Sequence, residues 1–381
     1  MENFVVSARK YRPSDFKSVV GQNHITTTLK NAIKNNHLAQ AFLFCGPRGV
    51  GKTTCARILA KTINCENLQE NGEACNECSS CKAFNTNSSF NVHELDAASN
   101  NSVDDIRNLV EQVRYAPQKG NYKIYIIDEV HMLSTQAFNA FLKTLEEPPK
   151  YAIFILATTE KHKILPTILS RCQIFDFNRI QINDISIHLS EIAKKEAIDY
   201  EDEALRLIAT KADGALRDAL SIFDLIVTFS AGKKVTYQET ISNLHVLDYD
   251  YYFKVTDALL EESISTALLI FDEILKKGFD GHNFLNGLSE HFRELMVCKD
   301  PETAVLLEVS ENAKKRYVEQ SAKSSLSFLL SALNICNQAD IHYKGSKNQR
   351  LHVELVLMKL ARLPQAINLA ALASQDSKKK V

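Results

Sequence analysis

Two hydrophobic patterns divide the chain near residue 178. Before that point, apolar runs alternate with segments of helical spacing. The runs predict strands at AFLFCG (41–46), NVHELDA (91–97), YKIYIID (122–128), AIFILATT (152–159) and CQIFDF (172–177). Helical spacing is found at residues 25–33, 51–63, 102–113, 134–147 and 165–171. Apolar strands separated by helices favour a parallel five-stranded sheet covered on both faces, which is an α/β fold.

After residue 178 the strand pattern stops and amphipathic helices follow. Three are predicted at residues 182–196, 201–212 and 216–229. From about residue 247 the chain again reads as helix, with segments at 251–262, 264–277, 281–297, 324–340 and 351–363. The pattern therefore indicates a small helical domain and then an all-α domain.

Composition narrows the class of protein. The 381 residues are 45% hydrophobic and 24% charged, with a formal net charge of −1. This balance lacks the basic excess of a general nucleic-acid coat, so any DNA contact should be local. No apolar run is long enough for a membrane helix, and the first residues lack a secretion signal, so we expect a cytoplasmic protein. Nine cysteines in such a compartment stay reduced, and a tight cluster of them indicates a metal site.

The motif GPRGVGKT connects the first predicted strand to the next helix. It matches the phosphate-binding loop G-x-x-x-x-G-K-[ST] in its proper strand–loop–helix context, which argues against a simple glycine turn. Its residues are Gly46, Pro47, Arg48, Gly49, Val50, Gly51, Lys52 and Thr53, followed by Thr54. Backbone N–H groups of such a loop cradle phosphate. We expect Lys52 to bind the β- and γ-phosphates and Thr53 to bind Mg²⁺.

Acidic residues end the strand at 122–128. Ligands of open α/β sheets bind at this carboxyl edge, where Asp128 and Glu129 emerge. Asp128 can hold Mg²⁺, directly or through water, and Glu129 can orient the attacking water. Taken alone, the pair is equally consistent with an acidic strand end that has no catalytic role.

Four further positions are less specific by themselves. A hydroxyl of Thr158 or Thr159, at the end of the next strand, can reach a γ-phosphate or a water, but threonine is also ordinary in strands. Arg171 ends a short helix and Arg217 lies in the helical region. Arginines at such positions are usually solvated surface residues.

Four cysteines follow the helix of the phosphate loop. Cys65, Cys75, Cys78 and Cys81 lie in a polar stretch that offers little for a hydrophobic core. Four thiolates at this spacing suit a tetrahedral structural zinc site. An iron–sulfur cluster, which also takes four cysteines, and free thiols are the alternatives. His93 lies in a predicted strand and is interpreted as structural, and the other five cysteines as small core residues.

Together, these motifs resemble one family, the γ/τ subunits of the bacterial DNA polymerase III clamp loader, which are AAA+ ATPases. The segments that carry the resemblance are YRPSDFKSVVGQ, GPRGVGKTT, the four-cysteine insert, IIDEVHMLSTQAFNAFLKTLEEPP, ILATTE, LPTILSRCQIF and GALRDALS, in that order. The resemblance implies a subunit that uses ATP, Mg²⁺ and a structural Zn²⁺. Its implied partners are other γ/τ copies, δ, δ′, the sliding β clamp and primer–template DNA, with no membrane.

The resemblance also implies roles for single residues. Lys52, Thr53, Asp128 and Glu129 keep the roles given above, and the four cysteines become zinc ligands. Thr159 becomes a sensor of the γ-phosphate, Arg217 a lid arginine that contacts nucleotide in cis, and Arg171 an arginine finger for a neighbour's ATP. The adenine pocket is implied to be lined by Tyr11, Arg12, Pro13, Val19 and Val20.

The implied domains are an AAA+ core at residues 1–179, a helical lid at 180–242 and a helical collar at 243–371. A zinc module occupies about 64–82 of the core, and residues 372–381 form a polar tail expected to be disordered. The chain ends just past the collar, as expected of a short γ form or a shortened τ form. Two rivals are a clamp-loader-like scaffold without activity and another AAA+ motor such as a Holliday-junction helicase.

Overall fold

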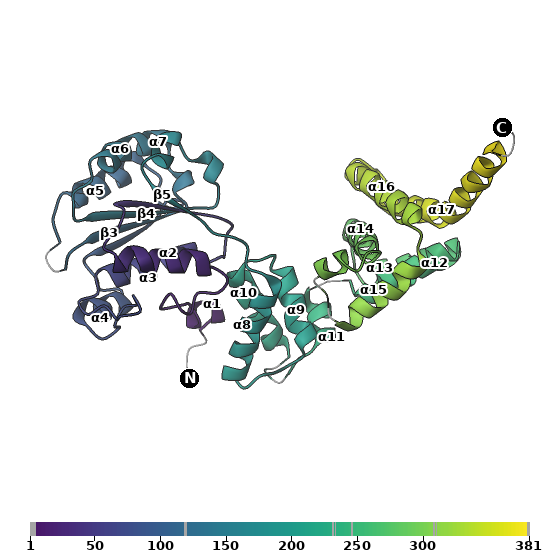
Figure 1. Ribbon diagram of the computed structural model, residues 1–381, viewed down its shortest axis with the longest axis horizontal. Helices are drawn as coiled ribbons and strands as arrows, with labels where there is room; N and C mark the ends of the chain where they lie inside the picture. The colour runs from purple at the N-terminus through teal and green to yellow at the C-terminus, as the bar shows by residue number, and fades with distance from the viewer. Residues whose placement is uncertain are drawn as a thin grey trace. The chain divides into compact units, whose positions relative to one another are not determined.

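A computed structural model describes residues 5–117, 120–230, 232, 234–244, 247–307, 309 and 311–378. The chain forms two compact units, Met1–Thr236 and Tyr237–Val381, which are described separately (Figure 1). Every helix in the described part of the chain is too short or too polar to span a bilayer.

A parallel five-stranded sheet is the centre of the first unit, as the sequence predicted. Its strands lie in the order β2-β3-β4-β1-β5. Their bounds are β1 Ala41–Cys45, β2 Val92–Asp96, β3 Lys123–Asp128, β4 Ala152–Thr158 and β5 Gln173–Asp176. The three central strands, β3, β4 and β1, are almost entirely buried, whereas β2 and β5 at the edges are partly exposed. Burial on both faces explains why the central strands are continuous apolar runs.

Helices cover both faces of this sheet. On one face, Phe42 and Ile126 pack with residues of α2 and α3, and on the other, Leu43 and Phe154 pack with residues of α5, α6 and α7 (Figure 1). The bounds are α1 Ser7–Lys10, α2 Asn23–Lys34, α3 Lys52–Ile63, α4 Ser79–Asn85, α5 Val103–Val113, α6 Thr135–Glu146 and α7 Pro166–Leu169, with 3₁₀ turns η1 Val130–Met132 and η2 Lys161–Lys163. Successive side chains of a strand point to opposite faces, so one strand serves both layers.

Three further helices complete the first unit. They are α8 Ile182–Lys195, α9 Asp202–Lys211 and α10 Leu216–Phe229. A two-stranded parallel sheet, β6 Asp199–Tyr200 and β7 Lys234–Val235, accompanies them. The prediction that strands stop near residue 178 was therefore wrong in this detail. Two-residue strands are too short to produce an alternating pattern. They form only because residues 199–200 and 234–235 lie side by side in the folded chain.

The second unit is all helix around one apolar core. Its helices are α11 Tyr237–Leu244, α12 Tyr249–Leu260, α13 Ile264–Lys276, α14 Gly281–Val297, η3 Thr303–Leu306, α15 Glu311–Lys323, α16 Leu326–Tyr343 and α17 Gln349–Lys378. Phe271, Phe292 and Phe328 are among the fully or nearly fully buried side chains of this core. Helix α17 extends over 372–378 of the segment predicted as a tail, and residues 379–381 lie outside the described residues.

Candidate nucleotide site and cysteine cluster

The phosphate loop leaves the carboxyl end of β1 and runs directly into α3. Gly51, at φ 101°, is the cap residue of α3, and Gly46 and Gly49 also have positive φ. Glycine adopts positive φ without strain, whereas residues with a Cβ are strained in this backbone conformation. At Gly46 there is also no space, because a Cβ would lie 2.4 Å from the carbonyl oxygen of Phe177. The loop glycines are therefore required by geometry as well as by the motif.

We expect Gly46→Ala to destabilise the first unit by about 2–4 kcal/mol, because backbone strain adds to overpacking. Thermal unfolding of the purified chain measures this. Gly232→Ala is the matched control, since Gly232 also has positive φ but a Cβ there would meet nothing within 4 Å. Equal effects of the two substitutions would show that the contact with Phe177 is unimportant.

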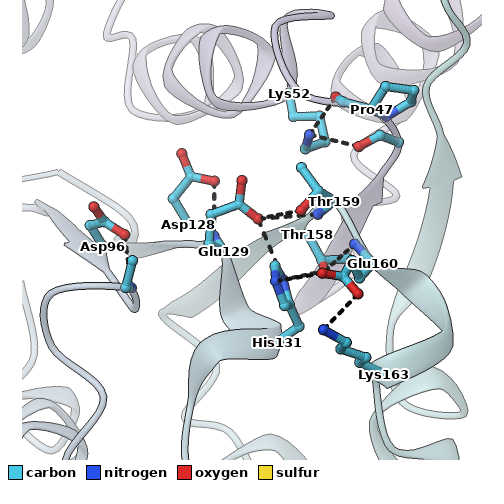
Figure 2. A network of polar contacts seen from close by, with 12 residues as sticks. Pro47, Lys52, Asp96, Asp128, Glu129, His131, Thr158, Thr159, Glu160 and Lys163 are labelled. Carbon is cyan, nitrogen blue, oxygen red and sulfur yellow. Dashed lines mark hydrogen bonds and ion pairs between the residues drawn. The ribbon is translucent and has the colours of Figure 1, made fainter. Parts of the chain in front are cut away.

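Lys52 is buried at the start of α3, and its side chain folds over the loop. Its Nζ donates hydrogen bonds to the carbonyl oxygens of Gly46 and Pro47, both at 2.7 Å (Figure 2). Burial lowers the pKa of Lys52, while the carboxylates of Glu129 and Asp128 act in the opposite direction. An ammonium placed between loop carbonyls and carboxylates is available to bind phosphate oxygens.

Thr53 joins the loop to the strand end. Its hydroxyl donates to Asp128 Oδ2 at 2.5 Å, across 75 residues of sequence. Thr53 lies in α3, which follows β1, whereas Asp128 ends β3, and β4 lies between these two strands in the sheet. The two residues therefore meet only because the sheet has this strand order. Two hard oxygen atoms side by side are the type of donor that Mg²⁺ prefers, so these residues fit the metal expected with ATP.

Glu129 and Thr159 form the second part of the site. Glu129 has a left-handed backbone, with φ of 48°. Its Oε2 accepts hydrogen bonds from the Thr159 hydroxyl at 2.9 Å and from the Thr159 N–H at 3.2 Å, as Figure 2 shows. The two predicted site residues are thus in direct contact, and the carboxylate is held at the end of β4.

His131 is a site residue that the sequence analysis missed. Its side chain is 6% exposed and lies between two carboxylates, with Nδ1 3.4 Å from Glu129 Oε2 and Nε2 3.6 Å from Glu160 Oε1. Its Nδ1 is also 3.0 Å from the Thr158 hydroxyl, which accepts the N–H of Glu160 (Figure 2). The available signal was its position three residues after Asp128, which alone does not separate a core histidine from a site histidine.

Two of the other predicted nucleotide contacts, Arg12 and Arg217, lie beside the same loop. The Arg12 Nε donates to the Thr54 hydroxyl at 3.3 Å. The N–H of Arg217, at the start of α10, donates to the Gly49 carbonyl at 3.3 Å. Tyr11 donates to Glu196 at the end of α8.

The remaining predicted contacts differ in burial. Those that are buried are Val19 and Val50, those that are half-buried are Pro13, Pro47, Val20 and Thr54, and Arg48 is exposed. Their contact with adenine or phosphate stays a prediction.

Arg171 is not part of this cluster. It lies just after α7, where Nη2 is 2.7 Å from Glu146 Oε1 and Nη1 donates to the Thr167 carbonyl at 2.6 Å. Its side chain is 33% exposed. This position is compatible with a role in a neighbouring subunit's site, which stays a prediction.

The four predicted cysteines meet in one cluster. The Sγ atoms of Cys65, Cys75, Cys78 and Cys81 all lie within 4.8 Å of one another. Thiolates bound at ~2.3 Å to a tetrahedral zinc ion would lie roughly 3.8 Å apart, so the four residues fit such an ion. His93 is not in the cluster and instead stacks on Tyr125, as expected of a structural residue.

Backbone N–H groups surround the sulfur atoms. The N–H of Cys75 donates to Cys65 Sγ at 3.2 Å, and the N–H of Cys78 donates to Cys75 Sγ at 3.3 Å. The N–H groups of Cys78 and Glu77 lower the pKa of Cys75 to about 6, whereas burial raises the pKa of Cys65. Donors directed at sulfur stabilise thiolates, which is the ligand form that zinc binds.

The sheet, the phosphate loop and the strand-end carboxylates define a P-loop protein of the AAA+ class. Three family models match consecutive parts of the chain. They are the DNA polymerase III delta subunit at residues 21–181, the DNA polymerase III clamp loader subunit ATPase lid domain at 184–232, and DNA polymerase III subunits gamma and tau domain III at 235–373.

Individual relatives agree with these models. The chain is 34% identical to DNA polymerase III subunit gamma of Buchnera aphidicola, over 93% of this chain and 98% of that protein. It is 42% identical to DNA polymerase III subunit tau of Bacillus subtilis, over 93% of this chain and 62% of that protein. The chain therefore belongs to the DNA polymerase III subunit gamma/tau family, and it spans about three fifths of the length of the Bacillus relative.

Among solved structures, the chain is similar to a Thermotoga maritima RuvB Holliday junction branch migration motor. The TM-score is 0.47 at 18% identity, over 66% of this chain and 80% of that chain. A similarity at this level is too weak to support an inference about function.

Proposed function

We propose that this chain is an ATPase subunit of the DNA polymerase III clamp loader, in which ATP binding and hydrolysis drive opening of the sliding clamp and its loading onto primed DNA. The contact between the Thr53 hydroxyl and Asp128 is the observation that carries the proposal. It joins the phosphate loop to a strand-end carboxylate pair at the edge of the sheet where nucleotides bind. A scaffold without activity would have no need to keep Lys52, Thr53, Asp128 and Glu129 in this arrangement.

In this proposal each side chain has a defined task. Lys52 neutralises the β- and γ-phosphates, and Thr53 with Asp128 holds Mg²⁺, which supplies charge neutralisation on the phosphates when bound. Glu129 orients the attacking water. Thr159 contacts that carboxylate directly, so it can report on what lies at the γ-phosphate position. Arg217 acts in cis from the lid, and Arg171 acts on a neighbour.

The partners proposed are other γ/τ copies, δ, δ′, the sliding clamp and primer–template DNA. The proposed division is an AAA+ core at 1–179, a lid at 180–242 and a collar at 243–371 that holds the subunits together. Replication of bacterial DNA occurs in the cytoplasm, so the cytoplasm is the proposed location. No polymerase active site is proposed for this chain.

One experiment separates this function from its rivals. ATP hydrolysis is measured with the assembled subunits, alone and with sliding clamp and primed DNA, and strand unwinding is measured in parallel. We expect turnover to rise with clamp and primed DNA and no unwinding to occur. An inactive scaffold would show no turnover, whereas a branch-migration motor would remodel DNA junctions without needing the clamp.

We further propose that the cysteine cluster holds one structural zinc ion. Elemental analysis of freshly purified chain should give one zinc per chain. Cys78→Ser should lower this value strongly, whereas Cys298→Ser, a half-buried cysteine outside the cluster, should leave it unchanged. Iron with visible charge-transfer absorbance, or metal content near zero, would contradict the assignment. Removing zinc should loosen residues 64–82 first, because they have little apolar surface to bury.

A further inference from the structure

The cysteine module, residues 64–82, is bound to a second part of the first unit by buried polar contacts. The contacted part is the start of the chain at Ser14–Phe16, which directly follows the segment Tyr11–Pro13. Glu73 of the module contacts Phe16 directly, whereas Asn76 of the module is linked to Ser14 through Lys61 of α3. The module begins immediately after α3, the helix of the phosphate loop. Through α3 and through residues 14–16, the module can affect the nucleotide site without contacting the nucleotide itself.

Glu73 provides the first contact. It is 6% exposed, and its Oε2 accepts the N–H of Phe16 at 3.0 Å. Its Oε1 lies 2.6 Å from Lys30 Nζ of α2. A buried carboxylate is stable only when it is paired and hydrogen-bonded, so this side chain fixes the position of Phe16 relative to the module.

Lys61 provides the second contact from α3. It is 4% exposed, and its Nζ donates to the Ser14 carbonyl at 2.6 Å and to Asn76 Oδ1 at 2.7 Å. Asn76 lies between Cys75 and Cys78 and has a left-handed backbone, with φ of 62°. One ammonium therefore connects α3, the start of the chain and the loop between two cysteines.

The same start of the chain reaches the nucleotide site. Arg12, two residues before Ser14, donates from Nε to the hydroxyl of Thr54 at 3.3 Å, and Thr54 follows Thr53 of the phosphate loop. Tyr11 donates to Glu196 at the end of α8. A shift at Ser14–Phe16 would therefore be transmitted over a very short length of chain to residues beside the loop.

We propose that Glu73 and Lys61 are positioning residues through which the metal-loaded cysteine module holds residues 11–16 in place for nucleotide binding. The inference rests on the proposed ATPase function. The buried apolar residues of the module are Ala74, Cys78 and Cys81, so its shape depends on metal–thiolate bonds. Zinc occupancy and nucleotide affinity are then coupled, and the coupling acts in both directions.

The first test measures nucleotide affinity and zinc content of the same full-length variants. Glu73→Ala should weaken binding of a fluorescent ATP analogue about tenfold while one zinc per chain is retained, which corresponds to loss of one charged hydrogen bond. Glu73→Gln should recover most of the affinity, because its amide oxygen still accepts the Phe16 N–H. Glu70→Ala, an exposed residue of the same module, should bind like the parent chain.

Lys61→Met tests the second contact, since it keeps the apolar stem but loses both hydrogen bonds, and it should also weaken nucleotide binding while keeping zinc. A separate measurement uses the unaltered chain and follows zinc transfer to a chromophoric chelator. Saturating ATP analogue should slow the transfer several-fold. Parental affinity in zinc-loaded Lys61→Met or Glu73→Ala, or zinc transfer unaffected by nucleotide, would overturn the inference.

A result that refutes the proposed ATPase function differs from one that refutes only the role of the cysteine module. An unaltered chain that bound no nucleotide, with zinc in place, would refute the ATPase assignment itself. An unaltered chain that bound nucleotide tightly, with variants that bound it equally well, would refute only the link between the module and the site.

Discussion

Lys52→Ala should reduce ATP hydrolysis by the assembled subunits to background, a loss of at least about 10²-fold. The Lys52 ammonium lies within the phosphate loop, at 2.7 Å from the carbonyl oxygens of Gly46 and Pro47. Alanine removes this charge at the position where negative charge must be neutralised. Steady-state phosphate release, measured with and without clamp and primed DNA, checks the expectation.

The fold should survive this substitution. Lys52 makes its hydrogen bonds within its own loop, and the surrounding core residues Val50 and Cys55 are untouched. Lys143→Ala, an exposed lysine of α6, is the matched control and should keep full activity. Hydrolysis at the parental rate in a folded Lys52→Ala chain would disprove the assignment of the phosphate loop.

Arg171→Ala should leave nucleotide binding by the isolated chain nearly unchanged but reduce stimulated hydrolysis in the assembled complex by about 10³-fold or more. Phosphoryl-transfer enzymes that receive an arginine in the transition state accelerate by about 10³–10⁵. In the chain itself, the contacts of Arg171 are with Glu146, Thr167 and Ser170, outside the nucleotide site. Loss of this exposed ion pair should cost little stability, about 1 kcal/mol at most.

Mixing of variants decides whether Arg171 acts between subunits. A chain with Arg171→Ala and an intact loop should regain activity at its own site when its neighbour supplies Arg171. A Lys52→Ala chain should not be rescued by any neighbour. Arg114→Ala, an exposed arginine after α5, is the control and should have no effect. Lost ATP binding in a lone Arg171→Ala chain would instead mean that the arginine acts in cis.

The local parts of the site were predictable from the sequence. The loop at 46–53 is a continuous motif, so the positions of its glycines, lysine and threonine could be identified from their fixed spacing. The central strands β3, β4 and β1 are continuous apolar runs because they are buried on both faces. The four cysteines form the predicted cluster. Cys75, Cys78 and Cys81 are separated by only two residues each, so their proximity could be expected from the sequence.

Elements with weak patterns were harder to predict. Helix α15, ENAKKRYVEQSAK, is mostly polar, so its spacing does not stand out. Helix α4 begins inside the cysteine module, where Cys78 is both a cluster residue and the cap of the helix, since its side chain accepts the N–H of Cys81. Packing and the cluster, rather than helical periodicity, select these helices.

The sequence by itself determined which residues are chemically competent, whereas only the tertiary structure decided which of them meet. Thr53 reaches Asp128, and Glu129 reaches Thr159, because parallel strands end at one edge of the sheet in the order β3-β4-β1. His131 joins that site, and Glu73 joins Phe16, through contacts across 27 and 57 residues. Such contacts arise from long-range packing, which leaves no periodic signal in the sequence, and their partners become identifiable only in the folded chain.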